Sequence, residues 1–153
     1  MGASNNTEEY NGDTWSDGED MLAGKRSHAV AGTQTAAVAI GGEGTEVNCQ
    51  EYNGTCWVAG GDMLGSGRKQ TSAFGTLTTA IVMGGHGYLT TAEQYDATCW
   101  SAVDSMPAGK ANFAAFGSAG TGLAAGGQVT GGGATTNTYK YGESVAARTV
   151  TDS

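Results

Sequence analysis

The stretch AAVAIGGEGTEVNCQEYNGTCWVAG, residues 36–60, decides the fold class. It contains an apolar run that ends in two glycines, a segment that ends at Tyr52 and a segment that begins near Trp57. Asn53-Gly54 lies between the last two segments and is a strong hairpin signal, because both residue types accept positive φ. Helical periodicity of useful length is missing from the whole sequence. We therefore predict consecutive antiparallel strands here and an all-β chain.

The landmarks of this stretch recur along the sequence, mostly at intervals of 42 or 43 residues, which is typical of a repeat architecture. A further strand, such as residues 26–32 or 70–75, precedes each apolar run. The 153 residues are predicted to form one repeat domain, with units near 7–24 (partial), 25–66, 67–109 and 110–153, the last with an atypical final strand. The repeated positions are the diglycines Gly41, Gly42, Gly84, Gly85, Gly126 and Gly127, the tyrosines Tyr10, Tyr52, Tyr95 and Tyr141, and the tryptophans Trp15, Trp57 and Trp100.

A diglycine followed by a Tyr about ten residues later and then by a Trp resembles the kelch repeat. That resemblance implies kelch-like β-propeller blades, each a four-stranded antiparallel sheet, with about 3 to 3.5 blades in this chain. The blocks EEYNGDTW (8–15) and AGTQTAAVAIGG (31–42) also resemble repeat-rich structural proteins of tailed phages, marine ones especially. This second resemblance implies a non-enzymatic structural or recognition protein of the virion, such as a tail fibre, spike or capsid decoration, synthesised in the host cytoplasm.

Two other functions remain open. The chain could be a cellular or secreted kelch-type binding module, lectin-like or adaptor, or an enzyme on a kelch scaffold, since a fold by itself determines no activity. The residues form no recognisable set of nucleophile, base and oxyanion donors, so we expect no enzyme and no cofactor. The acidic segment that starts at Asp13 lacks the ligand pattern of a calcium loop, and we expect no metal.

Charge and termini limit the partners. Fifteen acidic residues against seven basic ones give a net charge of −8, which disfavours nucleic acid and an anionic membrane surface. The opening residues MGASNNTEEY carry no signal-peptide pattern, and the apolar runs have strand length. Three cysteines without Cys-x-x-Cys spacing predict neither a disulfide framework nor a zinc site.

Cations and tryptophans also recur. Arg26, Arg68 and Lys110 keep a spacing of 42 residues. A bond from each cation to backbone or to the neighbouring blade is the favoured interpretation, and contact with a partner is the alternative. Trp57 and Trp100 are expected to be buried between adjacent blades, because they keep step with the hairpins.

The count of units predicts assembly. Roughly 3.3 units are fewer than the four to eight blades of a closed propeller. The first unit has its Tyr and Trp strands without a diglycine strand before them, so it could complete a blade elsewhere. We expect a homo-oligomer, with a dimeric ring favoured, and as further partners other virion proteins or a host-surface glycan. Ala146 stands where the fourth unit would need a Trp, and the role of residues 143–153 stays open.

Overall fold

The computed structural model describes residues 2–43, 46–118, 120–142 and 149–150. Its strands form a two-stranded N-terminal hairpin and three four-stranded antiparallel sheets, in each of which spatial order follows chain order. The all-β prediction is confirmed. The N-terminal hairpin consists of β1 (Glu8–Tyr10) and β2 (Trp15–Asp17). Within the predicted last strand, residues 143–148 and 151–153, including Ala146, lie outside the described part of the chain.

The three sheets are named I, II and III in chain order. Sheet I comprises β3 (Ala29–Thr33), β4 (Ala36–Ile40), β5 (Cys49–Tyr52) and β6 (Trp57–Ala59). Sheet II comprises β7 (Ser72–Phe74), β8 (Ile81–Met83), β9 (Ala92–Tyr95) and β10 (Trp100–Val103), with the short 3-10 turn η1 (Leu77–Thr79) between its first two strands. Sheet III comprises β11 (Ala114–Ser118), β12 (Thr121–Ala125), β13 (Thr138–Tyr141) and β14 (Thr149–Val150).

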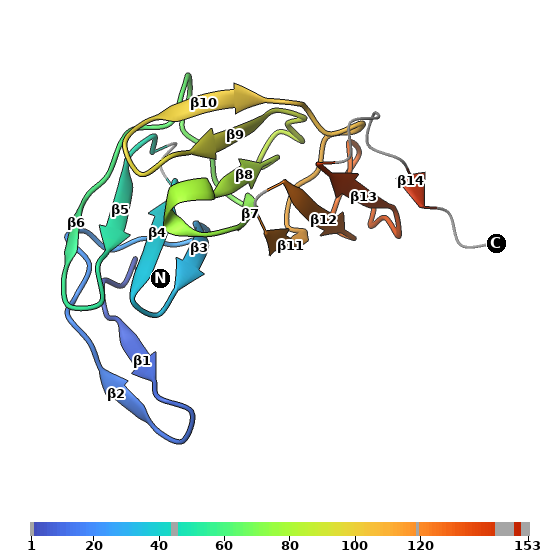
Figure 1. Cartoon of the computed structure of the whole chain (residues 1–153). Helices are drawn as coiled ribbons and strands as arrows, with labels where there is room; N and C mark the ends of the chain where they lie inside the picture. Colours follow the sequence, from blue (N-terminus) through green and yellow to red (C-terminus); the bar gives the residue numbers. More distant parts are fainter. Residues whose placement is uncertain (1, 44–45, 119, 143–148, 151–153) are drawn as a thin grey trace.

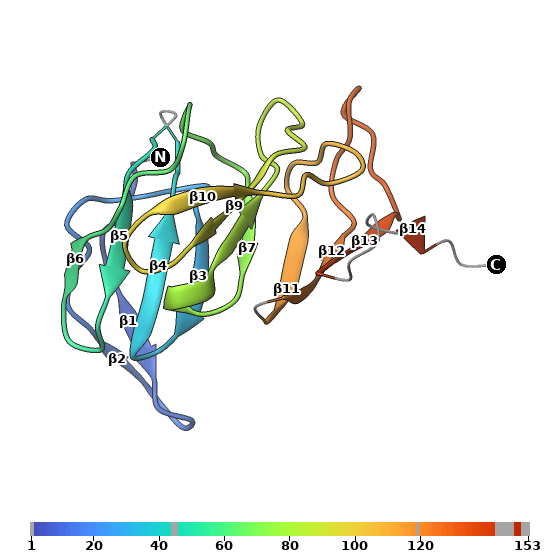
Figure 2. The ribbon, with the colours of Figure 1, turned by 45° about the horizontal axis from the view of Figure 1, so that its top comes forward.

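The sheets stand side by side along an open arc, with the N-terminal hairpin at one end and sheet III at the other (Figure 1). Their first strands are neighbours, since β7 lies between β3 and β11. Figure 2, in which the molecule is tilted, shows the same succession of sheets from another side. The described residues do not close this arc into a ring.

Two hydrophobic cores fill the spaces between the sheets. Val38, Ile40, Cys49, Tyr95 and Trp100 belong to the core between sheets I and II. Side chains of sheets II and III form the second core, whose members include Phe74, Ile81, Met83, Phe113 and Tyr139. Each sheet is therefore stabilised chiefly by its neighbours, as in other repeat architectures.

The Tyr and Trp landmarks face each other in the hairpins β1–β2, β5–β6 and β9–β10. In the second of these, Tyr52 lies opposite Trp57, with ring centroids 5.1 Å apart. The turn between them differs in mechanism from the prediction. Gly54 has φ +89°, whereas Asn53 is not among the residues of positive φ. Asn53 Oδ1 instead accepts hydrogen bonds from the backbone N–H groups of Thr55 and Cys56, both at 2.9 Å. A side chain that mimics a backbone turn thus closes a four-residue loop.

The diglycines mark close approaches between sheets. Gly41 and Gly84 have φ of +66° and +63°, which favours glycine. A Cβ atom on Gly84 would lie 2.6 Å from the carbonyl oxygen of Lys110, and one on Gly41 would lie 2.4 Å from that of Arg68. Glycine is therefore required at these positions for both conformation and space.

Candidate functional site

One cation of each sheet is buried against the backbone of its own sheet. Its exposed fraction is 6% for Lys25, 5% for Arg68 and 0% for Lys110. All three side chains donate to the carbonyl oxygen of the residue that directly precedes the third strand. These acceptors are Asn48 for Lys25, Thr91 for Arg68 and Asn137 for Lys110. The cation, which precedes the first strand of its sheet in the sequence, is thereby bonded to the start of the third strand of that sheet.

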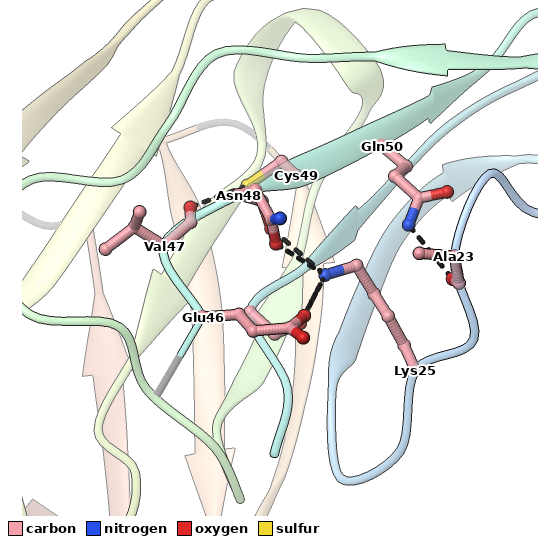
Figure 3. A network of polar contacts seen from close by, with 8 residues as sticks. Ala23, Lys25, Glu46, Val47, Asn48, Cys49 and Gln50 are labelled. Carbon is pink, nitrogen blue, oxygen red and sulfur yellow. Dashed lines mark hydrogen bonds and ion pairs between the residues drawn. The ribbon is translucent and has the colours of Figure 1, made fainter. Parts of the chain in front are cut away.

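In sheet I this cation is Lys25, whose Nζ is surrounded by oxygen atoms (Figure 3). It donates to Gly41 O at 2.9 Å and to Asn48 Oδ1 at 3.0 Å, and it pairs with Glu46 Oε2 at 2.8 Å. Lys110 makes the equivalent bond to Gly126 O at 2.9 Å. A lysine in this position can satisfy all three of its N–H donors within the protein.

The prediction placed Arg26 at this repeat position, and the structure corrects it to Lys25. The side chain of Arg26 is 47% exposed and pairs with Glu43 at the surface. A spacing rule could have identified Lys25, which precedes its diglycine by 16 residues, as Arg68 precedes Gly84 and Lys110 precedes Gly126.

The three buried cations differ in how their charge is balanced. Arg68 forms a buried ion pair with Glu93. Lys110 lies 4.5 Å above the centroid of the Tyr139 ring, a cation–π geometry, and burial lowers the pKa of its ammonium. Glu93 and Tyr139 occupy the same register position, two residues before Tyr95 and Tyr141, respectively.

The same residues also join one sheet to the next through their backbone. Gly42 N donates to the carbonyl oxygen of Arg68 at 3.0 Å, and Gly85 N donates to that of Lys110 at 2.8 Å. Burial of the Arg68 and Lys110 side chains favours the structural interpretation for both. Contact of Arg26 with a partner stays a prediction.

The repeated tyrosines bond to the preceding unit. Tyr52 Oη donates to Glu9 of the N-terminal hairpin, and Tyr95 Oη donates to Glu51 of sheet I. The bond to Glu9 is the main reason why the pKa of Tyr52 is raised. Burial, followed by the bond to Glu51, raises the pKa of Tyr95 to about 12. Tyrosine thus acts as a polar link between neighbouring units as well as a core residue.

Trp57 and Trp100 also bond to the preceding unit, and the exposed fraction of the repeated tryptophans rises from Trp100 to Trp15. Trp100 is 4% exposed, and its Nε1 donates to Gly61 O at 3.0 Å. Trp57 is half-buried, and its Nε1 donates to Thr7 Oγ1 at 2.9 Å. Burial between neighbouring units, as predicted, therefore holds for Trp100 and in part for Trp57. Trp15, at the open end of the arc, is 67% exposed.

The fourth repeated tyrosine, Tyr141, lies at the register position of Tyr52 and Tyr95. It stands opposite Gly122, and its ring contacts the edge of Phe74 with centroids 5.8 Å apart. Gly126 and Gly127 keep positive φ, as do the other two diglycines. The repeat therefore persists in sheet III up to Tyr141.

A groove of about 420 Å³ lies between the N-terminal hairpin and sheet I. Its lining includes Glu9, Val30, Ala37 and Trp57, together with His28 and Lys25. His28 is half-buried, and burial followed by the charge of Lys25 lowers its pKa. Its Nδ1 has no hydrogen-bond partner among the described residues.

Metal and thiol chemistry find little support in the geometry. Within residues 2–43, 46–118, 120–142 and 149–150, no three His, Cys, Asp or Glu side chains come together as a metal site. The three cysteines are free, and burial raises the pKa of the Cys49 thiol to about 11.

In the described part of the chain, no helix has the length and apolar character needed to cross a membrane.

These features define an all-β protein of repeated, face-to-face antiparallel sheets, each with a buried cation bonded to its own backbone. No protein-family model and no curated protein matches the sequence. The fold is similar to a solved structure described as "Structure of YjhT", with a TM-score of 0.70 and 17% sequence identity. The similarity covers 88% of this chain and 47% of the other, so this chain spans about half the length of that structure. At this identity the likeness concerns the fold.

Proposed function

We propose that this chain is a non-enzymatic structural and recognition module of a phage particle, built from kelch-like β-propeller blades. The observation that carries the proposal is the use of the repeated polar side chains. Lys25, Arg68 and Lys110 bond to the backbone of their own sheets, and Tyr52 and Tyr95 bond to the preceding unit. The repeated cations thus stabilise each sheet from within, and the repeated tyrosines join neighbouring units.

Such cohesion suits a scaffold. In a repeat array each unit contacts its neighbours, so hairpin tips can vary while the inter-unit contacts stay the same. The tips at residues 11–14, 53–56 and 96–99 carry different side chains on a common turn. The assignment to a phage particle comes from the blocks at 8–15 and 31–42, which resemble phage structural repeats.

Peptide mass spectrometry of purified particles tests the assignment to a virion. Particles of a phage whose genome encodes this chain, purified from a lysate on a gradient, should contain its peptides at a constant ratio to the major capsid protein. Peptides confined to the soluble fraction of the lysate would reject a virion role.

A carbohydrate-binding module is the second candidate, and one observation favours it. Tyr10 and Trp15 form an exposed aromatic pair, with centroids 5.1 Å apart and exposed fractions of 46% and 67%. Exposed aromatic faces can stack on sugar rings. Glycan titration followed by tryptophan fluorescence, with Trp15→Ala as the control, separates this candidate from the first.

A further inference from the structure

Along the described strands, the order of strand pairs is offset by half a unit from a series of complete four-stranded sheets, because the second half of a sheet comes first. Three inner pairs end in a diglycine: β3–β4, β7–β8 and β11–β12. Three outer hairpins carry a facing Tyr and Trp: β1–β2, β5–β6 and β9–β10. The first outer hairpin has no inner pair beside it among the described strands. The last inner pair is joined to β13–β14, which contains Tyr141. In the sequence, the residue five positions after Tyr141, where a Trp is due, is Ala146.

The groove at the N-terminal end lies where an inner pair would sit. In sheet I the third strand pairs with the second, so that Tyr52 faces Ala37. In the described part of the chain β1 pairs with β2 alone, which leaves its other edge open beside the groove. Ala37 and Val30, which is 50% exposed, form the opposite wall of that groove. An open strand edge next to an apolar wall is a typical acceptor for an added strand.

The other end of the arc carries the complementary surface. Phe74 and Phe116 occupy the same place in their sheets, each directly before a glycine of positive φ. Phe74 is 4% exposed because sheet III covers it, and a Cβ on Gly122 would lie 2.3 Å from its ring. Phe116 is 56% exposed. By register, the residue of sheet I that corresponds to Gly122 is Ala37, in the wall of the groove.

We propose that the β11–β12 hairpin of a second copy of this chain inserts into this groove, with its β12 paired to β1. The resulting blade has its inner strands from one copy and its Tyr–Trp hairpin from the other. Phe116 then packs against Ala37 of the partner copy, as Phe74 packs against Gly122. This inference stands apart from the proposed virion role, because it depends on strand phase and exposed surface alone.

The exchange replaces the pairing of β12 with β13 by a pairing with β1, and it gives up the contacts of Lys110 with Asn137 O and the Tyr139 ring. Gly122, which faces Tyr141 within one copy, faces Tyr10 of the second copy instead. Strand β13 leaves β12, and β1 takes its place together with Trp15, for which β13–β14 has no counterpart in the described residues. Reciprocal exchange gives three complete blades per copy and six in a ring of two, within the usual range of four to eight.

Disulfide trapping between two different variants tests the exchange. The native cysteines are first replaced by the residues at equivalent repeat positions: Cys49→Ala as at Ala92, and Cys56→Thr and Cys99→Thr as at Thr14. One preparation then receives Glu8→Cys and the other Ala124→Cys, which the proposed register places opposite each other. Because each copy carries one cysteine, a disulfide between the two variants can form only between copies.

After mixing and thiol–disulfide equilibration, a non-reducing gel should show a species of about twice 15.3 kDa, with both variants in it by mass spectrometry. Glu8→Cys mixed with Leu123→Cys is the control, since a shift of one residue places the two side chains on opposite faces. Equal linkage in both mixtures, or in neither, would overturn the proposed pairing.

Light scattering with surface variants supplies a second test. The exposed Phe116 can be replaced without opening the core of its own copy, so Phe116→Ser should keep the circular dichroism spectrum and weaken the dimer about tenfold or more. Val58→Ser changes another exposed apolar residue, 42% exposed, and should leave the dimer intact. A monomer for the unmodified chain at micromolar concentration, or a mass that grows beyond two copies, would overturn the ring.

Discussion

The backbone N–H of Gly85 donates to the carbonyl oxygen of Lys110 at 2.8 Å, which ties sheet II to the entry of sheet III. The ammonium group of the same lysine bonds to Gly126 O within sheet III. Lys110 thus links the backbone of sheets II and III through its carbonyl group, and it stabilises sheet III through its side chain. This arrangement recurs between sheets I and II, where Gly42 donates to Arg68.

The first prediction concerns the buried ion pair. Glu93→Ala should lower the free energy of unfolding by about 3–5 kcal/mol, because it leaves the charge of Arg68 buried without its partner. Glu46→Ala is the matched control. Its side chain is 38% exposed and pairs with Lys25, and its loss should cost about 0–1 kcal/mol. Urea titration measures both, and equal losses would contradict the assigned difference in burial.

The second prediction separates close approach from backbone conformation at glycine. Gly84→Ala places a methyl group 2.6 Å from Lys110 O at φ +63°. Gly87→Ala keeps a positive φ of +86°, but no atom lies within 4 Å of the added Cβ. We expect about 1–3 kcal/mol of destabilisation at Gly87 from conformation alone and a larger loss at Gly84. Similar thermal unfolding midpoints for the two variants would argue against a close approach at the diglycine.

The third prediction concerns alkaline pH. The pKa of Tyr95 is raised to about 12 in the folded protein, above its ordinary value near 10. Its contribution to stability is therefore complete below about pH 10 and is lost as the pH rises towards 12. Tyr95→Phe should be less stable by about 1 kcal/mol at pH 9, because the bonds to Glu51 and Gly61 are lost.

Urea titration at pH 9 and pH 11 provides the measurement. Stability of Tyr95→Phe should fall less between the two values than that of the unmodified protein. Tyr88→Phe, at a half-buried tyrosine outside the proposed exchange, is the matched control. A slope for Tyr95→Phe as steep as that of the unmodified chain would refute the link between this phenol and alkaline stability.

The fourth prediction concerns mild acid. Burial and the charge of Lys25 lower the pKa of His28 below its ordinary value of 6.5. The folded state therefore binds the proton less readily, so the contribution of His28 is present above pH 6.5 and declines as the pH falls below it. His28→Gln should reduce the loss of stability between pH 7 and pH 5.5, measured by thermal unfolding. His86→Gln, at an exposed histidine, is the control, and an identical effect of both variants would exclude a specific role for His28.

The sequence was sufficient for the strands and for their grouping into units. Hairpin signals, apolar runs and diglycines are local features, since they depend on the φ preferences of glycine and on the two-residue period of a strand. Tyr141 falls at the same register position as Tyr52 and Tyr95, although it lies 46 residues after Tyr95, a spacing longer than the repeat. The turn at Asn53 was recognised, but its mechanism was not, because backbone conformation and side-chain capping predict the same residue there.

The all-β class and the aromatic pairs were thus determined by the sequence itself, because each arises from neighbours within a few residues. The repeat period is visible directly as the recurrence of these local features along the sequence. Tertiary structure alone decided that Lys25 is buried and Arg26 is at the surface. Two adjacent cations have the same charge, and their partners, Gly41 and Asn48 for one and Glu43 for the other, lie 16 or more residues further along the chain. The exposure of Trp15 against the burial of Trp100 was decided in the same way, because it depends on whether a further sheet covers that face.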